Sequence, residues 1–274
     1  MDDPPPELKK TVHELAGIDP ASSQDQLPDL LAKIGAAADE LLRKVPNLIS
    51  QEAVSETQWT EASGKMVPGC VGRCFAPGNS SRRDQTFDYL IVTHPAPGGG
   101  VMVQEYRTRR NGKPISKGVA APDFQGFISA WIILSSPNQV ESRFRYLGQQ
   151  QMNGHNTAVI GFAQIPGLVE SPGQIVNDRG SVPMLLQGIA WVDESDFRVI
   201  RLRTDLLAPR PEIQLEKQTA DIVFGPVKIA SVDSVFWLPQ AVSLDMEAGG
   251  RFFREDHKYS KYRLFRAKSR IVSP

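Results

Sequence analysis

The chain lacks the features that would hold it in a membrane or attract it to nucleic acid. No segment contains the roughly 18 consecutive apolar residues that a transmembrane helix needs, so we predict no transmembrane segment. Lysine plus arginine and aspartate plus glutamate each number 31 among 274 residues, which gives a formal net charge of zero at pH 7. Because the chain has no net positive charge to attract phosphates, we predict no nucleic-acid partner.

Catalytic and cofactor motifs are also missing. The sequence contains no phosphate-binding loop, no dinucleotide-binding glycine fingerprint, no H-E-x-x-H and no G-x-S-x-G. Its four histidines are scattered and do not have the spacing of metal ligands. We therefore predict no catalytic residues, no metal and no cofactor. A hydrolase of unknown chemistry, with catalytic groups assembled from distant strands, is kept as an alternative.

Cysteine is rare: Cys70 and Cys74 lie in a stretch rich in glycine, proline and serine. Two thiols at this spacing can meet if the residues between them turn tightly, which Gly72 favours. We predict a disulfide between them, with free thiols or metal ligation as alternatives. A disulfide implies an oxidising compartment. The first residues, Met-Asp-Asp-Pro-Pro-Pro, do not resemble a signal peptide, so we expect an exported protein whose signal was removed or, alternatively, a cytoplasmic one.

The pattern of apolar residues predicts many strands and few helices. Leu27 to Val45 has apolar residues at intervals of three and four, typical of an amphipathic helix, and residues 1–26 before it are expected to form a flexible arm. A second helix is expected after Asp123, with Trp131 on its apolar face. Residues 63–83 are expected to form a long loop. Strands are expected at 50–60, 87–93, 101–109, 143–151, 157–164, 188–192, 198–206, 221–229, 235–238, 241–247 and 252–271.

Tight turns between these strands predict the sheet topology. Asn153-Gly154 is a strong hairpin signal, and Gly249-Gly250 marks another turn. Along residues 198–206 apolar and polar side chains alternate, as expected for a strand with one buried face. Since hairpins join antiparallel strands, we predict a single α+β domain over residues 27–274 with an antiparallel sheet.

Ionisable residues form two arrangements that merit attention. Asp88 and Glu105 lie on the two strands of one expected hairpin, where they would suit an acid–base pair. Three arginines between positions 107 and 110 favour a solvent-exposed ion-pair face instead. Asp256 and His257 are neighbours on a strand, so their side chains are expected on opposite faces and without a mutual hydrogen bond.

Large apolar side chains are the main candidates for a binding site. Aromatic residues on one face of a curved sheet either fill a core or line a cavity for an apolar ligand. The predicted lining residues are Trp131, Phe144, Tyr146, Phe162, Trp191, Phe236 and Trp237.

Over residues 140–271 the order of elements resembles the outer-membrane lipoprotein-sorting superfamily of Lol-type carriers, including uncharacterised secreted bacterial members. The resemblance rests on pattern and on these segments: Phe144-Arg-Tyr-Leu-Gly, Asn153-Gly154, Val159-Ile-Gly-Phe162, Ala190-Trp-Val-Asp193, Val199-Ile-Arg-Leu202, Phe236-Trp-Leu-Pro239 and Tyr259-Ser-Lys-Tyr262.

The resemblance implies a half-barrel, a strongly curved antiparallel sheet covered by two or three helices, which holds acyl chains or senses lipoproteins. It assigns no functional residue, because the groove is defined by shape and apolarity. We therefore predict a non-enzymatic, periplasmic or secreted protein that binds a lipid, an acyl chain or a lipidated partner. The alternatives are an envelope interaction or sensor module with a filled core, and a hydrolase. No oligomeric state is predicted.

Overall fold

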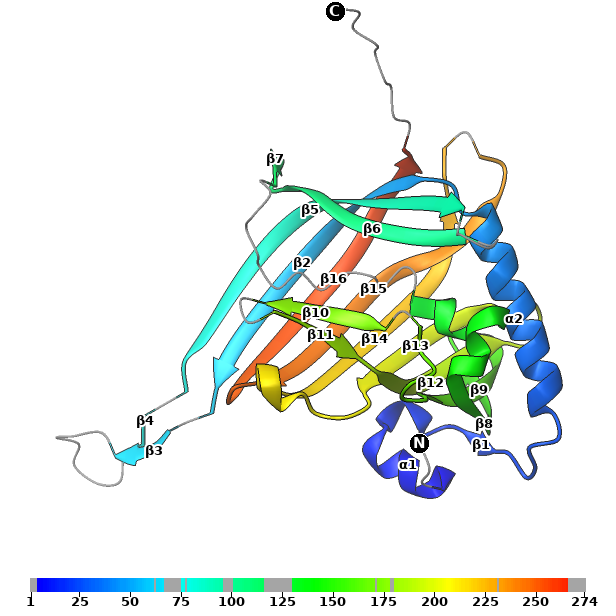
Figure 1. The fold of residues 1–274 in the computed structure, drawn as a ribbon, viewed down its shortest axis with the longest axis horizontal. Helices are drawn as coiled ribbons and strands as arrows, with labels where there is room; N and C mark the ends of the chain where they lie inside the picture. Colours follow the sequence, from blue (N-terminus) through cyan, green and yellow to red (C-terminus); the bar gives the residue numbers. More distant parts are fainter. Residues whose placement is uncertain are drawn as a thin grey trace, which may run out of the picture.

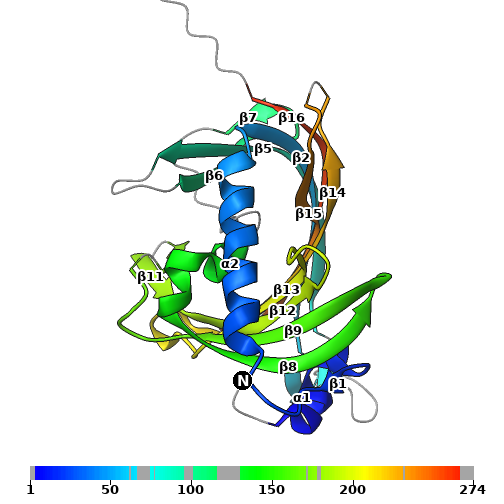
Figure 2. The same cartoon turned by 90° about the vertical axis from the view of Figure 1, so that its right-hand side faces the viewer.

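An open antiparallel sheet of 12 strands dominates the computed structural model. The model describes residues 4–61, 63–66, 75–76, 78–95, 101–115, 130–170, 172–177, 180–230 and 232–265. The strands lie in the order β1-β8-β9-β12-β13-β14-β15-β16-β2-β5-β6-β7, and the sheet curves strongly around helix α2 (Figures 1 and 2). The predicted fold class, a curved antiparallel sheet with few helices, is confirmed.

The sheet strands are β1 (Asp19–Pro20), β2 (Leu48–Thr60), β5 (Ser80–Pro95), β6 (Val101–Arg110), β7 (Lys113–Pro114), β8 (Ser142–Met152), β9 (His155–Gln164), β12 (Leu186–Asp193), β13 (Val199–Leu206), β14 (Leu215–Lys228), β15 (Val235–Ala248) and β16 (Arg251–Leu264). Two small hairpins are formed by β3 (Ser63–Met66) with β4 (Phe75–Ala76) and by β10 (Gly173–Asn177) with β11 (Gly180–Met184). The helices are α1 (Pro5–Thr11) and α2 (Leu27–Lys44), and the 3₁₀ turns are η1 (His13–Leu15), η2 (Ala130–Leu134), η3 (Ser136–Glu141) and η4 (Pro211–Ile213).

Local turns and one distant pairing together set the topology. Asn153 and Gly154 have positive φ values of 50° and 85° and join β8 to β9 as the hairpin signal predicts. The pairing of β16 with β2 joins segments from opposite ends of the chain and places His257 opposite Val54. This second pairing brings late and early residues onto one continuous face.

Helix α2 covers the concave face of the sheet (Figure 2). Leu30, Ile34 and Ala38 form its buried stripe and belong to the main hydrophobic cluster, together with Leu48 of β2 and Ile160 of β9. The amphipathic helix predicted from the sequence is thus confirmed, and its apolar stripe packs into the core as its periodicity implies.

The N-terminal arm packs on the opposite face. Leu8, Val12 and Leu15 are buried in a second hydrophobic cluster, which also contains Leu147, Val159, Ile189 and Trp191 of the sheet. The side-chain amide of Gln24 makes two hydrogen bonds to the backbone of Tyr146: Nε2 donates to its carbonyl oxygen at 2.9 Å, and Oε1 accepts from its N–H at 2.8 Å. The arm expected to be flexible is therefore packed from Leu8 onward, because it covers apolar side chains and part of the exposed edge of β8.

Two further expectations need correction. Strand β5 begins at Ser80, so the last residues of the expected loop at 63–83 are paired with β2, and residues 63–66 and 75–76 form the β3–β4 hairpin. The expected segments 235–238 and 241–247 form one continuous strand, β15, with a bulge in its pairing to β14 near Phe224. Bulges bend a strand without ending it, so β15 continues through Pro239, which lies between the two expected segments.

Other predictions lie partly or wholly outside the described residues. These are the disulfide of Cys70 and Cys74, the first part of the helix expected after Asp123 and the end of the strand expected at 252–271. Of the expected helix, residues 130–134 are described and form the 3₁₀ turn η2. Among the helices of the described ranges, none is both long and apolar enough to span a membrane.

Candidate functional site

An apolar cleft lies between α2 and the sheet. We call it the α2 cleft, and it is lined by Ile34, Ala37, Ala38, Leu41, Trp131, Phe197, Arg198, Val199, Phe224 and Trp237. Its free volume is about 20 Å³, which is enough for about one water molecule. A larger ligand enters only if α2 or the lining side chains move.

The polar contacts of α2 run to η3. Gln139 Nε2 donates to the carbonyl oxygen of Leu31 at 2.8 Å, and the amide of Ser136 donates to Asp39 Oδ1 at 3.3 Å. Gly35 allows a close approach, because a Cβ at this position would lie 2.6 Å from Ser136 Oγ. Within the described chain, α2 is thus hydrogen-bonded to a turn, while its contacts with the sheet are apolar.

The turn between β12 and β13 places an aromatic ring against α2. Phe197 has a φ of 60°, an uncommon conformation for a bulky residue, and its amide donates to the Asp193 carbonyl at 2.8 Å. Lys33 Nζ of α2 lies 5.2 Å from the centre of the Phe197 ring, within cation–π range. The turn and the helix are therefore linked through a contact that movement of α2 would break.

Two tryptophans of the cleft differ in their hydrogen bonding. Trp237 Nε1 donates to the carbonyl oxygen of Val199 at 2.8 Å, and the Arg198 guanidinium stacks over its ring at 4.6 Å. Trp131 is 4% exposed, and its buried Nε1 has no hydrogen-bond partner among the described residues. Of the two lining tryptophans, Trp237 thus donates to a described acceptor and Trp131 does not.

The predicted lining residues do not all share one face. Trp131, Tyr146, Phe162 and Phe236 are buried in the main cluster, and Phe144 and Trp237 pack against it. Trp191 belongs to the second cluster, beneath the N-terminal arm. The structure thus places Trp191 away from the other predicted lining residues, because side chains alternate along β12 and both of its faces are apolar, with Ala190 and Val192 facing the concave side. Trp131 and Trp237 are the predicted residues that line the α2 cleft itself.

A second part of the concave face carries buried charges. Glu52 of β2 binds Arg107 of β6 through both carboxylate oxygens, at 2.7 Å to Nε and 2.9 Å to Nη2. His257 Nδ1 of β16 lies 2.8 Å from Glu52 Oε1, and its Nε2 lies 3.1 Å from Glu255 Oε2. Tyr259 donates its hydroxyl to Glu52 at 3.1 Å. We call these five residues the Glu52 cluster.

Burial and pairing act in opposite directions on the pKa values of the Glu52 cluster. Burial alone would raise the pKa of Glu52, but hydrogen bonds from His257 and Arg107 outweigh it and lower the pKa below 4.5. Burial alone would lower the pKa of His257, but Glu255 and Glu52 outweigh it and raise the pKa above 6.5. Burial, with the nearby charge of Glu52, raises the pKa of Tyr259 well above 10.0. His257 contacts a carboxylate at each nitrogen, which matches the two N–H donors of an imidazolium.

The sequence analysis missed this cluster. The expected exposed ion-pair face at residues 105–110 is wrong, because Glu105 is buried and the Arg107 side chain is 4% exposed. Asp88 and Glu105 do not form a pair: Asp88 lies opposite Arg109, and Glu105 accepts a hydrogen bond from Tyr89 at 2.5 Å. The alternation of Glu255, His257 and Tyr259 on one face of a strand was a usable signal, but Glu52 lies 205 residues from His257 in sequence.

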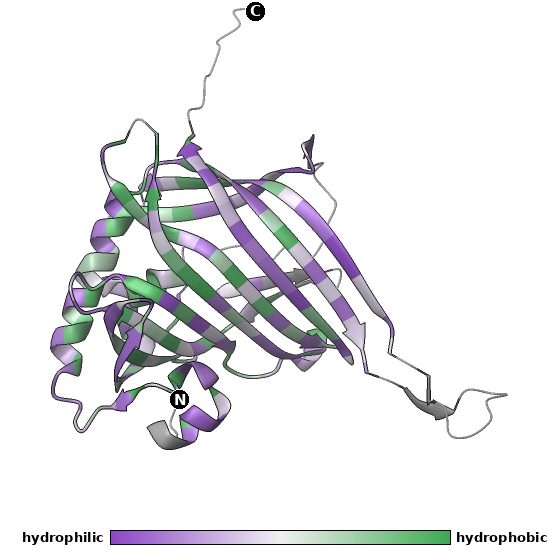
Figure 3. Ribbon diagram, turned by 180° about the vertical axis from the view of Figure 1, so that it is seen from behind, coloured by the Kyte–Doolittle hydropathy of each residue, from purple (hydrophilic) through white to green (hydrophobic). Residues whose placement is uncertain are grey.

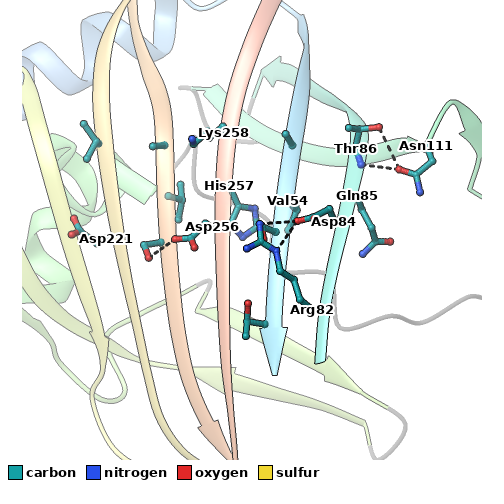
Figure 4. Close-up of a pocket in the computed structure, with 17 residues that line it drawn as sticks. Val54, Arg82, Asp84, Gln85, Thr86, Asn111, Asp221, Asp256, His257 and Lys258 are labelled. Carbon is teal, nitrogen blue, oxygen red and sulfur yellow. Dashed lines mark hydrogen bonds and ion pairs between the residues drawn. The ribbon is translucent and has the colours of Figure 1, made fainter. Parts of the chain in front are cut away.

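The outer face of β2, β5, β14, β15 and β16 forms a hollow of about 720 Å³ (Figure 4). From this convex side, hydrophilic residues are frequent along β16, β2 and β5 (Figure 3). Several of its charged groups have partners: Arg82 lies 3.3 Å from Asp84, and Ser243 donates to Asp256 at 3.0 Å. As expected from strand alternation, Asp256 lies on this outer hollow while the His257 side chain is buried within the Glu52 cluster.

A histidine–aspartate pair lies at one end of the sheet. His155 Nδ1 is 2.6 Å from Asp193 Oδ2, and Ser195 donates its hydroxyl to Asp193 Oδ1 at 2.7 Å. The hydroxyl and the imidazole therefore bind one carboxylate from two sides, which does not place the serine as a nucleophile activated by the histidine. In the part of the chain that the structure describes, no group of three or more His, Cys, Asp or Glu side chains has the arrangement of a metal site.

No family model and no curated protein matches the chain. Its fold is similar to that of a LolA superfamily protein from Nitrosomonas europaea, with 14% identity and a TM-score of 0.35 over 87% of this chain and 94% of that one. A DUF1329 family protein from Desulfovibrio piger has 12% identity and a TM-score of 0.41 over 89% and 95%.

A domain from Vibrio parahaemolyticus, named for outer membrane lipoprotein sorting, has 14% identity and a TM-score of 0.37 over 84% of this chain and 90% of that one. Chains of the superfamily predicted from the sequence are thus among the structural neighbours. TM-scores below 0.5 do not establish membership of a family, so the function has to be argued from the α2 cleft and the Glu52 cluster.

Proposed function

We propose that this protein is a non-enzymatic, exported binding protein that holds a lipid, an acyl chain or a lipidated partner between α2 and the concave face. The observation that carries the proposal is the α2 cleft: aromatic and aliphatic side chains lie under an amphipathic helix whose tertiary hydrogen bonds, within the described chain, go to η3 and not to the sheet. A helix held to the sheet by apolar contacts can exchange those contacts for contacts with an apolar ligand.

The energetics of the cleft favour an apolar ligand. Its walls offer few polar groups, and Arg198, the charged residue among them, is bound to Asp196 at 2.7 Å and stacked on Trp237. A buried methylene group contributes about 0.8 kcal/mol, so a chain of several carbons would offset the displacement of α2. A charged ligand group would lose its hydration there without an available partner.

The experiment compares two variants of α2. Ala38→Trp places an indole in the cleft, and Ala36→Trp places the same side chain on the exposed face of the helix. We expect phospholipid to co-purify with the wild type and with Ala36→Trp, and to be lost from Ala38→Trp, when native mass spectra are recorded. Near-ultraviolet circular dichroism checks that both variants keep their tertiary packing. Equal lipid content in both variants would contradict this location of the site.

A second candidate is an interaction or sensor module with a filled core. The observation that favours it is the small free volume of the α2 cleft, about 20 Å³. Such a module would purify without lipid and would show no change in melting temperature with phospholipids or acylated peptides, whereas the binding protein would be stabilised by ligand according to its affinity.

A further inference from the structure

Trp131, a lining residue of the α2 cleft, has a buried hydrogen-bond donor that meets no acceptor among the described residues. The residue is 4% exposed and lines the cleft, yet its indole Nε1 has no acceptor within the described part of the chain. Buried side-chain donors are paired in the large majority of cases, and an unpaired one calls for a specific explanation. Trp237, on another wall of the same cleft, follows the rule by donating to Val199.

We propose that Trp131 Nε1–H binds a carbonyl oxygen of the ligand, so that the preferred ligands are acyl esters or amides and not plain alkyl chains. This inference rests on the proposed function and adds a requirement for one neutral acceptor. Tryptophan suits this task, because its ring can contact the acyl chain of the ligand while its N–H binds and orients the carbonyl oxygen.

The surroundings of Trp131 select a neutral acceptor over a charged one. Arg198 is paired with Asp196, and Lys33 lies over the Phe197 ring and does not line the cleft. A carboxylate or phosphate would find no unpaired cation among the described lining residues, and its desolvation would be unfavourable. An ester or amide carbonyl needs one donor, which Trp131 supplies.

A single water molecule is the competing explanation, because about 20 Å³ accommodates one. The two explanations differ in their consequences for ligands. A carbonyl acceptor makes the protein distinguish an ester from an ether of equal length, whereas a water held independently of the ligand makes no such distinction.

The test uses two matched probes, 1-palmitoyl-lysophosphatidylcholine and its 1-O-hexadecyl ether analogue. They share the headgroup and chain length and differ at the carbonyl. Isothermal titration calorimetry below their micelle concentrations should show that the wild type binds the ester roughly 2- to 10-fold more tightly, the range expected for one hydrogen bond. Trp131→Phe should reduce the ester affinity to that of the ether. Trp59→Phe, at a tryptophan that stacks on Phe252 and does not line the α2 cleft, should keep the wild-type ratio.

Equal affinity of the wild type for both probes would overturn the inference while leaving the proposed function intact, and so would a ratio that persists in Trp131→Phe. Failure of the wild type to bind either probe would overturn the proposed function and this inference together. If Trp131→Phe does not fold, the indole ¹⁵N–¹H signal of Trp131 in the wild type gives the same answer. It should move downfield with the ester and not with the ether, and an identical response to both probes contradicts carbonyl binding.

Discussion

The concave face of the sheet has two halves that are buried to a similar extent and stabilised in different ways. Beneath α2, over β8 to β15, the side chains are apolar and leave a small cleft. On β16, β2 and β6 the Glu52 cluster fixes four charged side chains by direct ion pairs. Apolar contacts can be exchanged for similar contacts with a ligand, but opening an ion pair in a buried site leaves unpaired charges. We therefore expect the region beneath α2 to adapt to a ligand and the Glu52 cluster to stay rigid.

The largest expected effect comes from breaking the charged half. Arg107→Met removes the bidentate partner of Glu52 and leaves a carboxylate buried with His257 and Tyr259. We expect a loss of about 3–5 kcal/mol in the free energy of unfolding, measured by urea denaturation, because the remaining charge is uncompensated.

Arg82→Met is the matched control. It removes an arginine from an exposed pair with Asp84 on the outer face and is expected to cost about 0–1 kcal/mol. Similar losses for the two variants would show that the Glu52 cluster is no more tightly fixed than the surface.

A smaller effect is expected from loosening the apolar half. Gly35→Ala places a Cβ 2.6 Å from Ser136 Oγ, 2.8 Å from Gln139 Nε2 and 3.2 Å from the Ser136 Cα. The two side chains must therefore shift, and the backbone contact favours movement of α2 away from η3. We expect a loss of about 1–3 kcal/mol from overpacking, although alanine alone would favour the helix by about 1 kcal/mol. Because the α2 cleft then opens, binding of the apolar dye ANS should increase.

The outcome that would refute this view of α2 is a Gly35→Ala variant more stable than the wild type, with unchanged dye binding. It would mean that the contact between α2 and η3 adapts without moving the helix.

The smallest expected effect is the pH dependence of the free energy of unfolding, which arises from the Glu52 cluster. The pKa of His257 is raised above 6.5, so its pairing contributes fully below pH 6.5 and is lost as the pH rises through the higher folded-state pKa. In that window the free energy of unfolding should fall by up to about 1.4 kcal/mol per pH unit. Glu52 has a lowered pKa and affects stability at acidic pH. Its contribution to the free energy of unfolding is present above pH 4.5 and is lost on acidification through its folded-state pKa.

Urea denaturation across pH 5–9 tests this prediction, with His257→Gln as the comparison. The variant should lack the decline that starts near the unfolded-state pKa of histidine, about 6.5. A decline of equal size in both proteins would assign the effect to other groups.

Several features could be predicted because their signals are local. The interval of apolar residues from Leu27 to Val45 predicted α2 almost to its last residue, and Asn153-Gly154 predicted the β8–β9 hairpin. Alternation correctly separated Asp256 from His257. In each case the physical cause acts within one turn or one strand, so the sequence contains it in full.

Other features could not be predicted, because they depend on which distant segments of the chain pack against one another. Trp191 was expected in the groove, but both faces of β12 are apolar, and the packing of Leu8 and Leu15 on one of them decides its position. The charges at residues 105–110 suggested solvent exposure. Their burial requires the carboxylate of Glu52, which β2 brings beside β6 and β16 only in the assembled sheet.

By itself the sequence determined the local features of this protein: an amphipathic helix, strands with alternating side chains, hairpin turns and a net charge of zero. The tertiary structure decided which apolar face receives α2, which receives the N-terminal arm, and which charges are buried together. The physical reason is that periodicity orients a side chain relative to its own strand. The partner that pairs with that side chain can lie more than 200 residues away, as Glu52 does from His257 and Tyr259.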